Sequence, residues 1–289
     1  MDYKFLEKLA NEGELITSWE SELVQEQIYA QIIDAAYANR VGRQLFKPVQ
    51  LRAGSALNFE LETKNSITFN RVAETGLLLK DIENYTEIIV TPVKYGCSVA
   101  IAREMIEDAN WDLIKRNLTA LGIQAGLKED ALVVAAMADT TYGFYAGTTS
   151  SHRVTTTGTE LDIVDIVNAI VYPLTDDCNP NVMLLNPKQV GELNQIDTFV
   201  EADKVGARTT FEKGFIGRIY GLDCIVSSSC TADRVYILDT SRAGVIVIRR
   251  DLSTSLFEVP ERDSRGIACT FREAAQVLYP DAGCDIVVS

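Results

Sequence analysis

Three features are scarce in this chain of 289 residues, and each scarcity excludes a class of protein. No run of about 18 apolar residues occurs, so we expect neither a membrane-spanning helix nor a membrane partner. The six cysteines are scattered without a C-x-x-C pair, which excludes a disulfide scaffold and favours a reduced, intracellular protein. The single histidine, His152, cannot by itself supply a zinc-type ligand set. We therefore expect no metal.

Catalytic patterns are equally scarce. A Ser-His-Asp or Cys-His arrangement would have to use His152, and no G-x-S-x-G motif accompanies it. We interpret His152 as an ordinary surface residue of a Ser/Thr-rich loop. The glycines of 214–221 are not followed by Lys-Ser or Lys-Thr, so they do not form a phosphate-binding loop. The sequence thus predicts no catalytic residue and no cofactor.

Two acidic segments have simple structural interpretations. The oxygen-rich segment 176–181 lacks the twelve-residue calcium-loop pattern, and we interpret it as a turn that ends a helix. Glu129 and Asp130 are adjacent in a helical segment, and we interpret them as part of a solvent-exposed face.

Positive charge is in deficit. The chain has 41 acidic residues against 27 Lys and Arg, a formal net charge of −14. A surface this acidic argues against sequence-independent binding to DNA or to an anionic membrane. The hydrophobic fraction of 47% and the charged fraction of 24% are those of an ordinary globular protein. The length allows one large core or two modest domains.

The N-terminal region predicts an amphipathic helix at about 18–40. The T-x-x-E pattern at 17–20 fits a capping box. Val24, Ile28 and Ile32 follow at helical spacing and share one face.

A period-two pattern follows on both sides of a polar turn at 63–66. Its apolar residues are Leu57, Phe59, Leu61, Ile67 and Phe69. Such a pattern predicts a β-hairpin. Because an isolated two-stranded hairpin is marginal in water, we expect this one to lie on the body of the protein or on a neighbouring subunit.

The middle of the chain predicts strands at 85–91 and 93–101, followed by a helix from about 102 to 138. A helix of that length would span roughly 50 Å and predicts an elongated molecule. Gly122 and Gly126 lower the local helix propensity, so a bend is expected there.

The C-terminal half mixes both kinds of element. Helices are predicted at about 162–172 and 187–195, a buried strand at 182–185, and close-spaced strands from 218 to 288. The fold class is therefore α+β.

Several of these segments resemble one known family. The segment 91–109, TPVKYGCSVAIAREMIEDA, continues with the GLKED run at 126–130 and is similar to the entry into the spine helix of HK97-fold major capsid proteins of tailed double-stranded DNA viruses. NVMLLNP at 181–187 and IGRIYG at 216–221 resemble the family's axial domain. The order of elements resembles that of the family over nearly the whole chain.

The resemblance implies an HK97-like fold in four parts. These are an N-terminal arm at 1–47, an E-loop hairpin at 48–92, a peripheral domain at 93–140 and 245–275, and an axial domain at 141–244 and 276–289. It also implies contacts between subunits, made by E-loop residues Leu57, Phe59, Leu61, Ile67 and Phe69 and by arm residues Val24, Ile28 and Ile32.

The implied function is that of a major capsid protein, which forms hexamers and pentamers of an icosahedral shell around double-stranded DNA. Implied partners are portal and scaffold proteins, possible decoration proteins and non-specifically packaged DNA; the implied location is the virion after assembly in the host cytoplasm. One alternative is an encapsulin-type compartment around a cargo enzyme. Another is an enzyme or binding module on an unrelated α+β fold.

Overall fold

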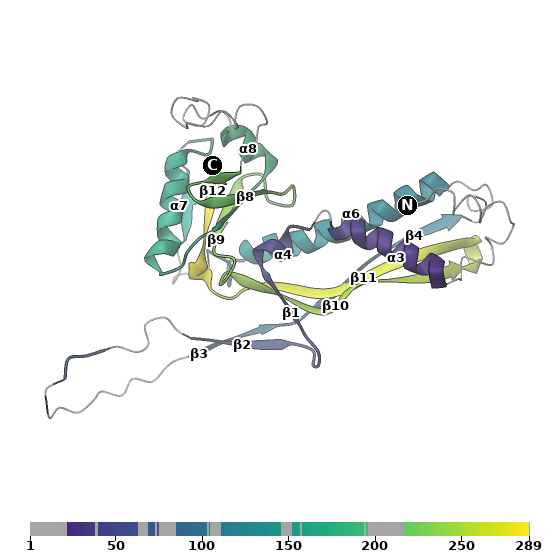
Figure 1. Cartoon of the computed structure of the whole chain (residues 1–289), viewed down its shortest axis with the longest axis horizontal. Helices are drawn as coiled ribbons and strands as arrows, with labels where there is room; N and C mark the ends of the chain where they lie inside the picture. The colour runs from purple at the N-terminus through teal and green to yellow at the C-terminus, as the bar shows by residue number, and fades with distance from the viewer. Residues whose placement is uncertain are drawn as a thin grey trace.

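The computed structural model describes residues 22–37, 40–62, 69–72, 74, 85–102, 104, 111–145, 152–156, 158–193, 195 and 217–288. These residues form a four-stranded sheet, a six-stranded sheet and a two-stranded ribbon. The two larger sheets lie in separate lobes, and the ribbon extends away from both (Figure 1). None of the described helices has the length and apolar character needed to cross a membrane.

The first lobe is built on the four-stranded sheet, whose order is β1-β10-β11-β4. Its strands are β1 (Lys47–Gln50), β10 (Gly244–Val259), β11 (Ser264–Val277) and β4 (Val93–Ala102). β10 and β11 form a long antiparallel hairpin closed by η1 (Pro260–Arg262), and β1 pairs with β10 in parallel. Sequence alternation predicts β4 almost to the residue. The strand β10 is continuous from Gly244 to Val259, with register shifts between Ile248 and Ser253.

The spine helix α6 (Trp111–Met137) runs along this sheet, and α3 (Glu22–Tyr37) packs against it (Figure 1). Its 27 residues span about 40 Å. β4 continues through Ala102 and Glu104 is already helical, so the change from strand to helix lies close to the expected residue; residues 103 and 105–110 lie outside the described part.

The two glycines of α6 serve packing and do not interrupt the helix. A Cβ on Gly122 would lie closer than van der Waals contact to the Ile32 carbonyl oxygen of α3. A Cβ on Gly126 would lie 2.9 Å from the Ala36 carbonyl oxygen. Both glycines therefore allow the backbones of α3 and α6 to approach closely.

The second lobe is built on the six-stranded sheet, whose order is β5-β12-β9-β6-β8-β7. Its strands are β5 (Arg153–Thr155), β12 (Gly283–Val287), β9 (Arg234–Leu238), β6 (Val182–Leu185), β8 (Leu222–Val226) and β7 (Arg218–Ile219). α7 (Ile163–Thr175) and α8 (Pro187–Leu193) belong to the same lobe, with η2 (Pro280–Ala282) before β12. β6 is buried along its whole length, as its unbroken apolar run predicts.

One apolar cluster joins the two lobes. Phe46 and Ile246 come from the first lobe, Met137 from the end of α6, and Tyr236 from β9 of the second. Phe144, also fully buried, lies with its ring centroid 6.5 Å from that of Tyr236. The lobes thus share a continuous core.

The ribbon consists of β2 (Leu57–Glu62) and β3 (Tyr85–Val90), paired antiparallel from Leu57↔Val90 to Glu62↔Tyr85. Among the described residues, β2 pairs with β3 and not with Phe69, the described member of the partner expected around 67–69, which lies outside any strand. Alternation identifies a strand but not its partner, and the partner here lies more than twenty residues further along the chain. Ile67 and the turn at 63–66 lie outside the described residues.

The acidic pair of the spine helix is buried, contrary to expectation. The short helix α4 (Gly42–Leu45) sits beside it, and Asp130 Oδ1 accepts hydrogen bonds from the backbone N–H groups of Val41 at 2.9 Å and Gly42 at 2.7 Å. Burial raises the pKa of Asp130, whereas these two N–H groups act to lower it. Asp130 thus holds the chain where it leaves the N-terminal region.

Glu129 forms an ion network with the same segment. Its Oε1 lies 2.7 Å from Nε of Arg43, and its Oε2 lies 3.1 Å from Nε of Arg40. Arg43 also reaches Asp251 of β10 at 2.8 Å and Glu273 of β11 at 3.3 Å. Burial acts to lower the pKa of Arg43, but its hydrogen bonds to Asp251 and Glu129 raise it well above its ordinary value. The network ties the arm, the spine helix and the β10–β11 hairpin together.

Candidate inter-subunit surfaces

The inner face of the ribbon packs on its own chain. Leu61 is 9% exposed and joins a cluster with Leu51 and Val247, against which Leu57 and Phe59 are half-buried. The strand β2 thus lies on the body of its own chain, one of the two positions expected for it, and the contact of the half-buried Leu57 and Phe59 with a neighbouring subunit stays a prediction. The cause is the pairing with β3, which turns their side of the ribbon toward β1 and β10.

The outer face of the ribbon is exposed and acidic. It carries Tyr85 and Ile89, the latter 60% exposed, together with Glu60, Glu62 and Glu87. Glu60 lies directly opposite Glu87, a like-charge pair that destabilises an isolated ribbon.

The sequence contains a signal for this apolar outer residue that the sequence analysis missed. Ile88, Ile89 and Val90 are consecutive, so one of them must face outward whatever the register. Beyond the ribbon, Phe69 is fully exposed.

The arm residues have different surroundings. Ile32 is completely buried between α3 and α6 of its own chain, so its expected contact with a neighbouring subunit is wrong. The close approach permitted by Gly122 is the physical reason, because it covers this face of α3. Val24 and Ile28 lie on α3, but their side chains fall outside the described part.

α7 carries an apolar stripe that sequence reasoning did not single out. The stripe consists of Val164, Val167, Val171 and Leu174, which are between 41% and 60% exposed. Their spacing of three, four and three residues places them on one face of the helix. The opposite face, with Ile166 and Ala169, is buried against the six-stranded sheet.

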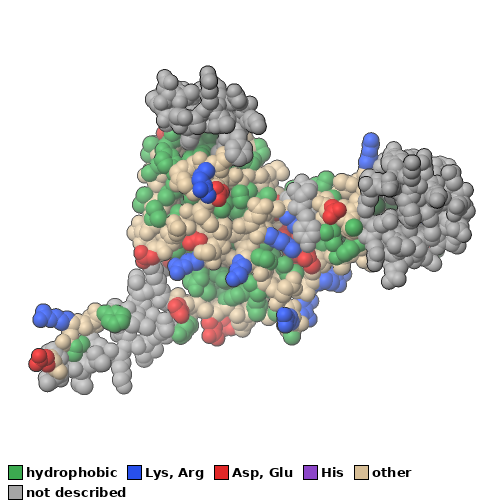
Figure 2. All heavy atoms as spheres, viewed as in Figure 1, with side chains coloured by type: hydrophobic (Ala, Val, Ile, Leu, Met, Phe, Trp, Pro, Cys, Tyr) green, Lys and Arg blue, Asp and Glu red, His purple; other side chains and the backbone are tan. Residues whose placement is uncertain are grey.

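The helix α7 lies on the side of the second lobe that is away from α6 (Figure 1). Figure 2 shows hydrophobic side chains gathered along this edge of the lobe. Segment 163–174 is apolar on both faces, and this was the available signal: a helix apolar all round is typical of burial on both sides.

A family model described as phage capsid protein matches residues 85–284, which is more than half of the chain. The chain belongs to this phage capsid family. The matched region begins at β3 of the ribbon and includes most of both lobes.

Solved capsid structures share the fold. A virus-like particle from Pyrococcus furiosus is similar with a TM-score of 0.64 at 14% identity, over 90% of this chain and 98% of that one. The capsid of cyanophage P-SCSP1u has a TM-score of 0.64 at 13% identity, over 85% and 86%. Microbacterium phage Oxtober96 has a TM-score of 0.63 at 16% identity, over 86% and 91%. No curated protein sequence matches the chain.

These matches confirm the HK97-like fold that segment 91–109 implies. The protein is a major capsid protein that forms a shell, and the encapsulin alternative is not favoured, because the matching family model describes phage capsid proteins. As a member of a capsid family, it is a structural protein.

The capsid protein buries its one histidine, and the expected surface position of His152 is wrong. The ring lies beside that of Tyr172 of α7, with centroids 5.4 Å apart and the planes tilted by 40°, and it contacts the turn that follows α7. That turn confirms the helix-ending interpretation of 176–181: Asp176 caps α7, and Asp177 adopts a left-handed φ of 56°.

Proposed function

We propose that the shell built from this chain encloses the double-stranded DNA of a tailed phage. Copies of the chain form hexamers and pentamers, assemble in the host cytoplasm, and bind a portal protein and a scaffold protein. The chain itself carries no catalytic role. The four-part division given by the resemblance, with 93–140 and 245–275 as the peripheral domain, is supported by the sheet arrangement in which β4, β10 and β11 share one lobe.

The observation that carries the assembly proposal is the stripe on α7. A stripe of exposed valines and leucine on a helix already buried on its other face needs cover in water. A neighbouring copy is the cover that a shell provides. Tyr85, Ile89 and Phe69 are also exposed apolar or aromatic residues, so we infer that a neighbouring copy covers them as well. The proposed inter-subunit contacts of the E-loop are therefore made by residues that are exposed in the single subunit.

The net negative charge of the chain supports the proposal that the protein binds the packaged DNA only weakly. At a net charge of −14, non-specific attraction to DNA phosphates is unfavourable. We infer that counterions, rather than this chain, neutralise most of the charge of the DNA.

The double variant Val167→Glu/Val171→Glu tests the proposal. We expect the wild-type chain to form particles visible by negative-stain electron microscopy, and the variant to sediment as folded subunits or small oligomers. Two buried carboxylates facing a neighbour's apolar surface would be unpaired, which opposes association. Circular dichroism checks that the variant is folded.

The matched control is Val167→Ile/Val171→Ile, which keeps the stripe apolar and should assemble. Normal particles from the glutamate variant would show that α7 does not face a neighbouring copy. A wild-type chain that stays a monomer at high concentration, together with the scaffold protein, would contradict the shell itself.

A further inference from the structure

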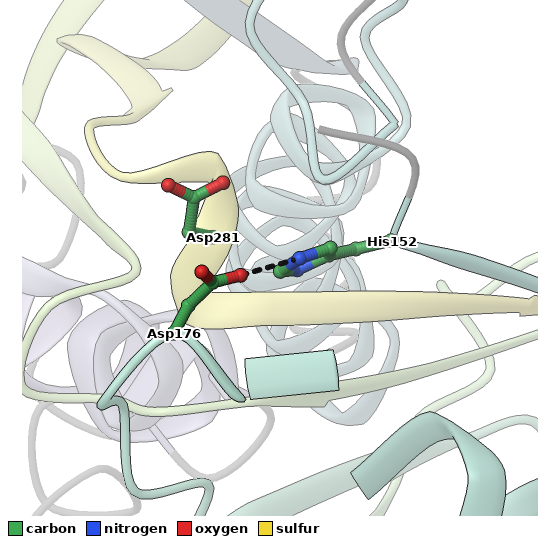
Figure 3. Close-up of side chains that lie close together, drawn as sticks. All are labelled: His152, Asp176 and Asp281. Carbon is green, nitrogen blue, oxygen red and sulfur yellow. Dashed lines mark ion pairs between the residues drawn. The ribbon is translucent and has the colours of Figure 1, made fainter. Parts of the chain in front are cut away.

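Three potential metal ligands converge in the second lobe. They are His152, just before β5, Asp176 at the C-terminal end of α7, and Asp281 within η2 (Figure 3). One ligand atom of each residue lies within 4.8 Å of the other two. The ring of His152 is buried, while both carboxylates are half-buried. Three segments far apart in the sequence thus bring one ring nitrogen and two carboxylates close together.

The hydrogen bonds of His152 orient the ring for a cation. Its Nδ1 lies 2.9 Å from the carbonyl oxygen of Gly283. A carbonyl oxygen can only accept, so Nδ1 carries a hydrogen. In the neutral ring, Nε2 then has a lone pair, and it faces Asp176 Oδ2 at 2.9 Å. Two lone pairs at this distance repel unless a cation, either a proton or a metal ion, lies between them.

We propose that His152, Asp176 and Asp281 bind a divalent transition-metal ion of the Zn²⁺ type. One imidazole and two carboxylates are a hard-to-borderline ligand set that suits Zn²⁺. The Gly283 carbonyl supplies the outer-shell hydrogen bond that histidine ligands of metals make in most sites. The inference concerns a single subunit and does not rest on shell assembly.

The surrounding backbone holds the histidine in place. The His152 carbonyl oxygen accepts from the backbone N–H of Asp285 at 2.9 Å, which extends the β5–β12 pairing to this residue. The neighbouring Arg153 directs its guanidinium to Asp285 Oδ2 at 2.8 Å instead of toward the cluster.

Metal binding requires a small opening of the cluster. Zn²⁺ bonds of about 2.0–2.2 Å place two ligands of one ion roughly 3.4 Å apart at a tetrahedral angle. The His152–Asp176 separation of 2.9 Å must therefore widen by about 0.5 Å. Asp176 is on the turn after α7 and 30% of its side chain is exposed, so it has room to move.

The bound ion would join the loop before β5, the end of α7 and the start of β12. Because binding to the folded state alone stabilises it, the thermal midpoint should rise with metal concentration.

A variant at Asp281 distinguishes a metal ion from a proton as the cation between His152 and Asp176. A proton shared by His152 and Asp176 needs no third ligand, whereas a metal ion loses affinity without it. The substitution Asp281→Asn keeps the size of the side chain and leaves the His152–Asp176 pair intact.

The experiment is a Zn²⁺ titration of the full-length chain after removal of metal with EDTA. We expect about one Zn²⁺ per chain by calorimetry and by elemental analysis of the gel-filtered protein. Asp281→Asn and Asp176→Asn should each weaken binding by at least about tenfold, the loss typical even of outer-shell substitutions.

The matched control is Asp177→Asn, which makes the same charge change beside the cluster at an exposed position. Asparagine tolerates the left-handed φ of 56° at this residue, so Zn²⁺ affinity should stay as in the wild type. The proposal fails if the wild type binds no Zn²⁺. It also fails if Asp281→Asn binds Zn²⁺ as tightly as Asp177→Asn does, which would leave a proton as the bridge.

Discussion

The ion network behind α4 is unbalanced in charge. Arg40 and Arg43 face three carboxylates, those of Glu129, Asp251 and Glu273. Burial raises the pKa of Glu273 to about 8, the nearby Glu129 adds to the rise, and Arg43 opposes it. Glu273 is therefore protonated near neutral pH, which leaves two guanidinium groups facing two carboxylates.

This protonation makes stability depend on pH. The pKa of Glu273 is about 8 in the folded chain against an ordinary value of 4.5, so the folded state binds more protons between these values. The stabilisation is complete below about pH 4.5 and is lost as the pH rises toward 8. Glu273→Gln should remove this loss, which we expect to be on the order of 2 kcal/mol, as measured by urea unfolding at pH 5, 6.5 and 8.

The control is Glu258→Gln, an exposed glutamate of the same hairpin, 2.8 Å from Arg265 at the surface. It should keep the wild-type pH profile. Parallel profiles for wild type and Glu273→Gln would show that Glu273 is charged in the folded chain.

Gly283 provides a second test at single-residue resolution. A Cβ there would overlap the buried ring of Phe144. Gly283→Ala should therefore lower the free energy of unfolding by about 1–3 kcal/mol, the usual cost of overpacking. Gly191→Ala on α8 has open space around it and should instead stabilise by about 0.5–1 kcal/mol, because alanine favours helix. Equal urea midpoints for the two variants would contradict this packing.

At the scale of elements, the hydrophobic pattern of a segment predicts the position and burial of that segment's own strand or helix. The alternation at 93–101 and the unbroken apolar run at 182–185 correspond to β4 and β6 because each pattern reports the burial of its own residues. The partner of β2 and the burial of Glu129 depend on residues far away in sequence. Arg43 lies 86 positions from Glu129, and no spacing rule connects them.

The packing of α3 on α6 depends on a missing side chain. Gly122→Ala would push against the Ile32 carbonyl and the Ala35 side chain, and we expect a cost of about 1–3 kcal/mol. Amide hydrogen exchange should show α3 losing protection while the β10–β11 hairpin keeps it. Gln124→Ala, at an exposed position of the same helix, is the control and should leave exchange unchanged. Unaltered protection in Gly122→Ala would mean that the two helices separate at little cost.

At the scale of the whole molecule, the ribbon gives two kinds of variant. Phe69→Asp changes a fully exposed residue, so subunit stability should change by less than about 0.5 kcal/mol while particle yield falls.

Leu61→Asp places a charge in a buried position and should destabilise the attachment of the ribbon by about 2–4 kcal/mol. Limited proteolysis measures the second effect and electron microscopy the first.

Normal particles from Phe69→Asp would remove this residue from the proposed contacts. Proteolysis of Leu61→Asp at the wild-type rate would show that the inner face of the ribbon does not hold it to β1 and β10.

The candidate surfaces could be predicted only in part. Alternation at 57–61 locates a strand with one apolar face, but which neighbour covers that face depends on the partner strand and the fold. Ile32 belongs to the apolar face predicted for the arm helix, and the sequence does not show that Gly122 brings a helix of the same chain over it. His152 has mostly Ser and Thr around it in the sequence, and its contact with the start of β12 joins residues more than a hundred positions apart.

The β10–β11 hairpin runs through the first lobe as one hydrogen-bonded ladder, broken in register only between Ile248 and Ser253 among its paired residues. A ladder resists shear along its length, so bending concentrates where the pairing is irregular. Copies of the chain at positions of different shell curvature would therefore differ mainly in the backbone conformation of this short stretch. The regularly paired parts of the hairpin on either side of it would keep the same conformation in every copy.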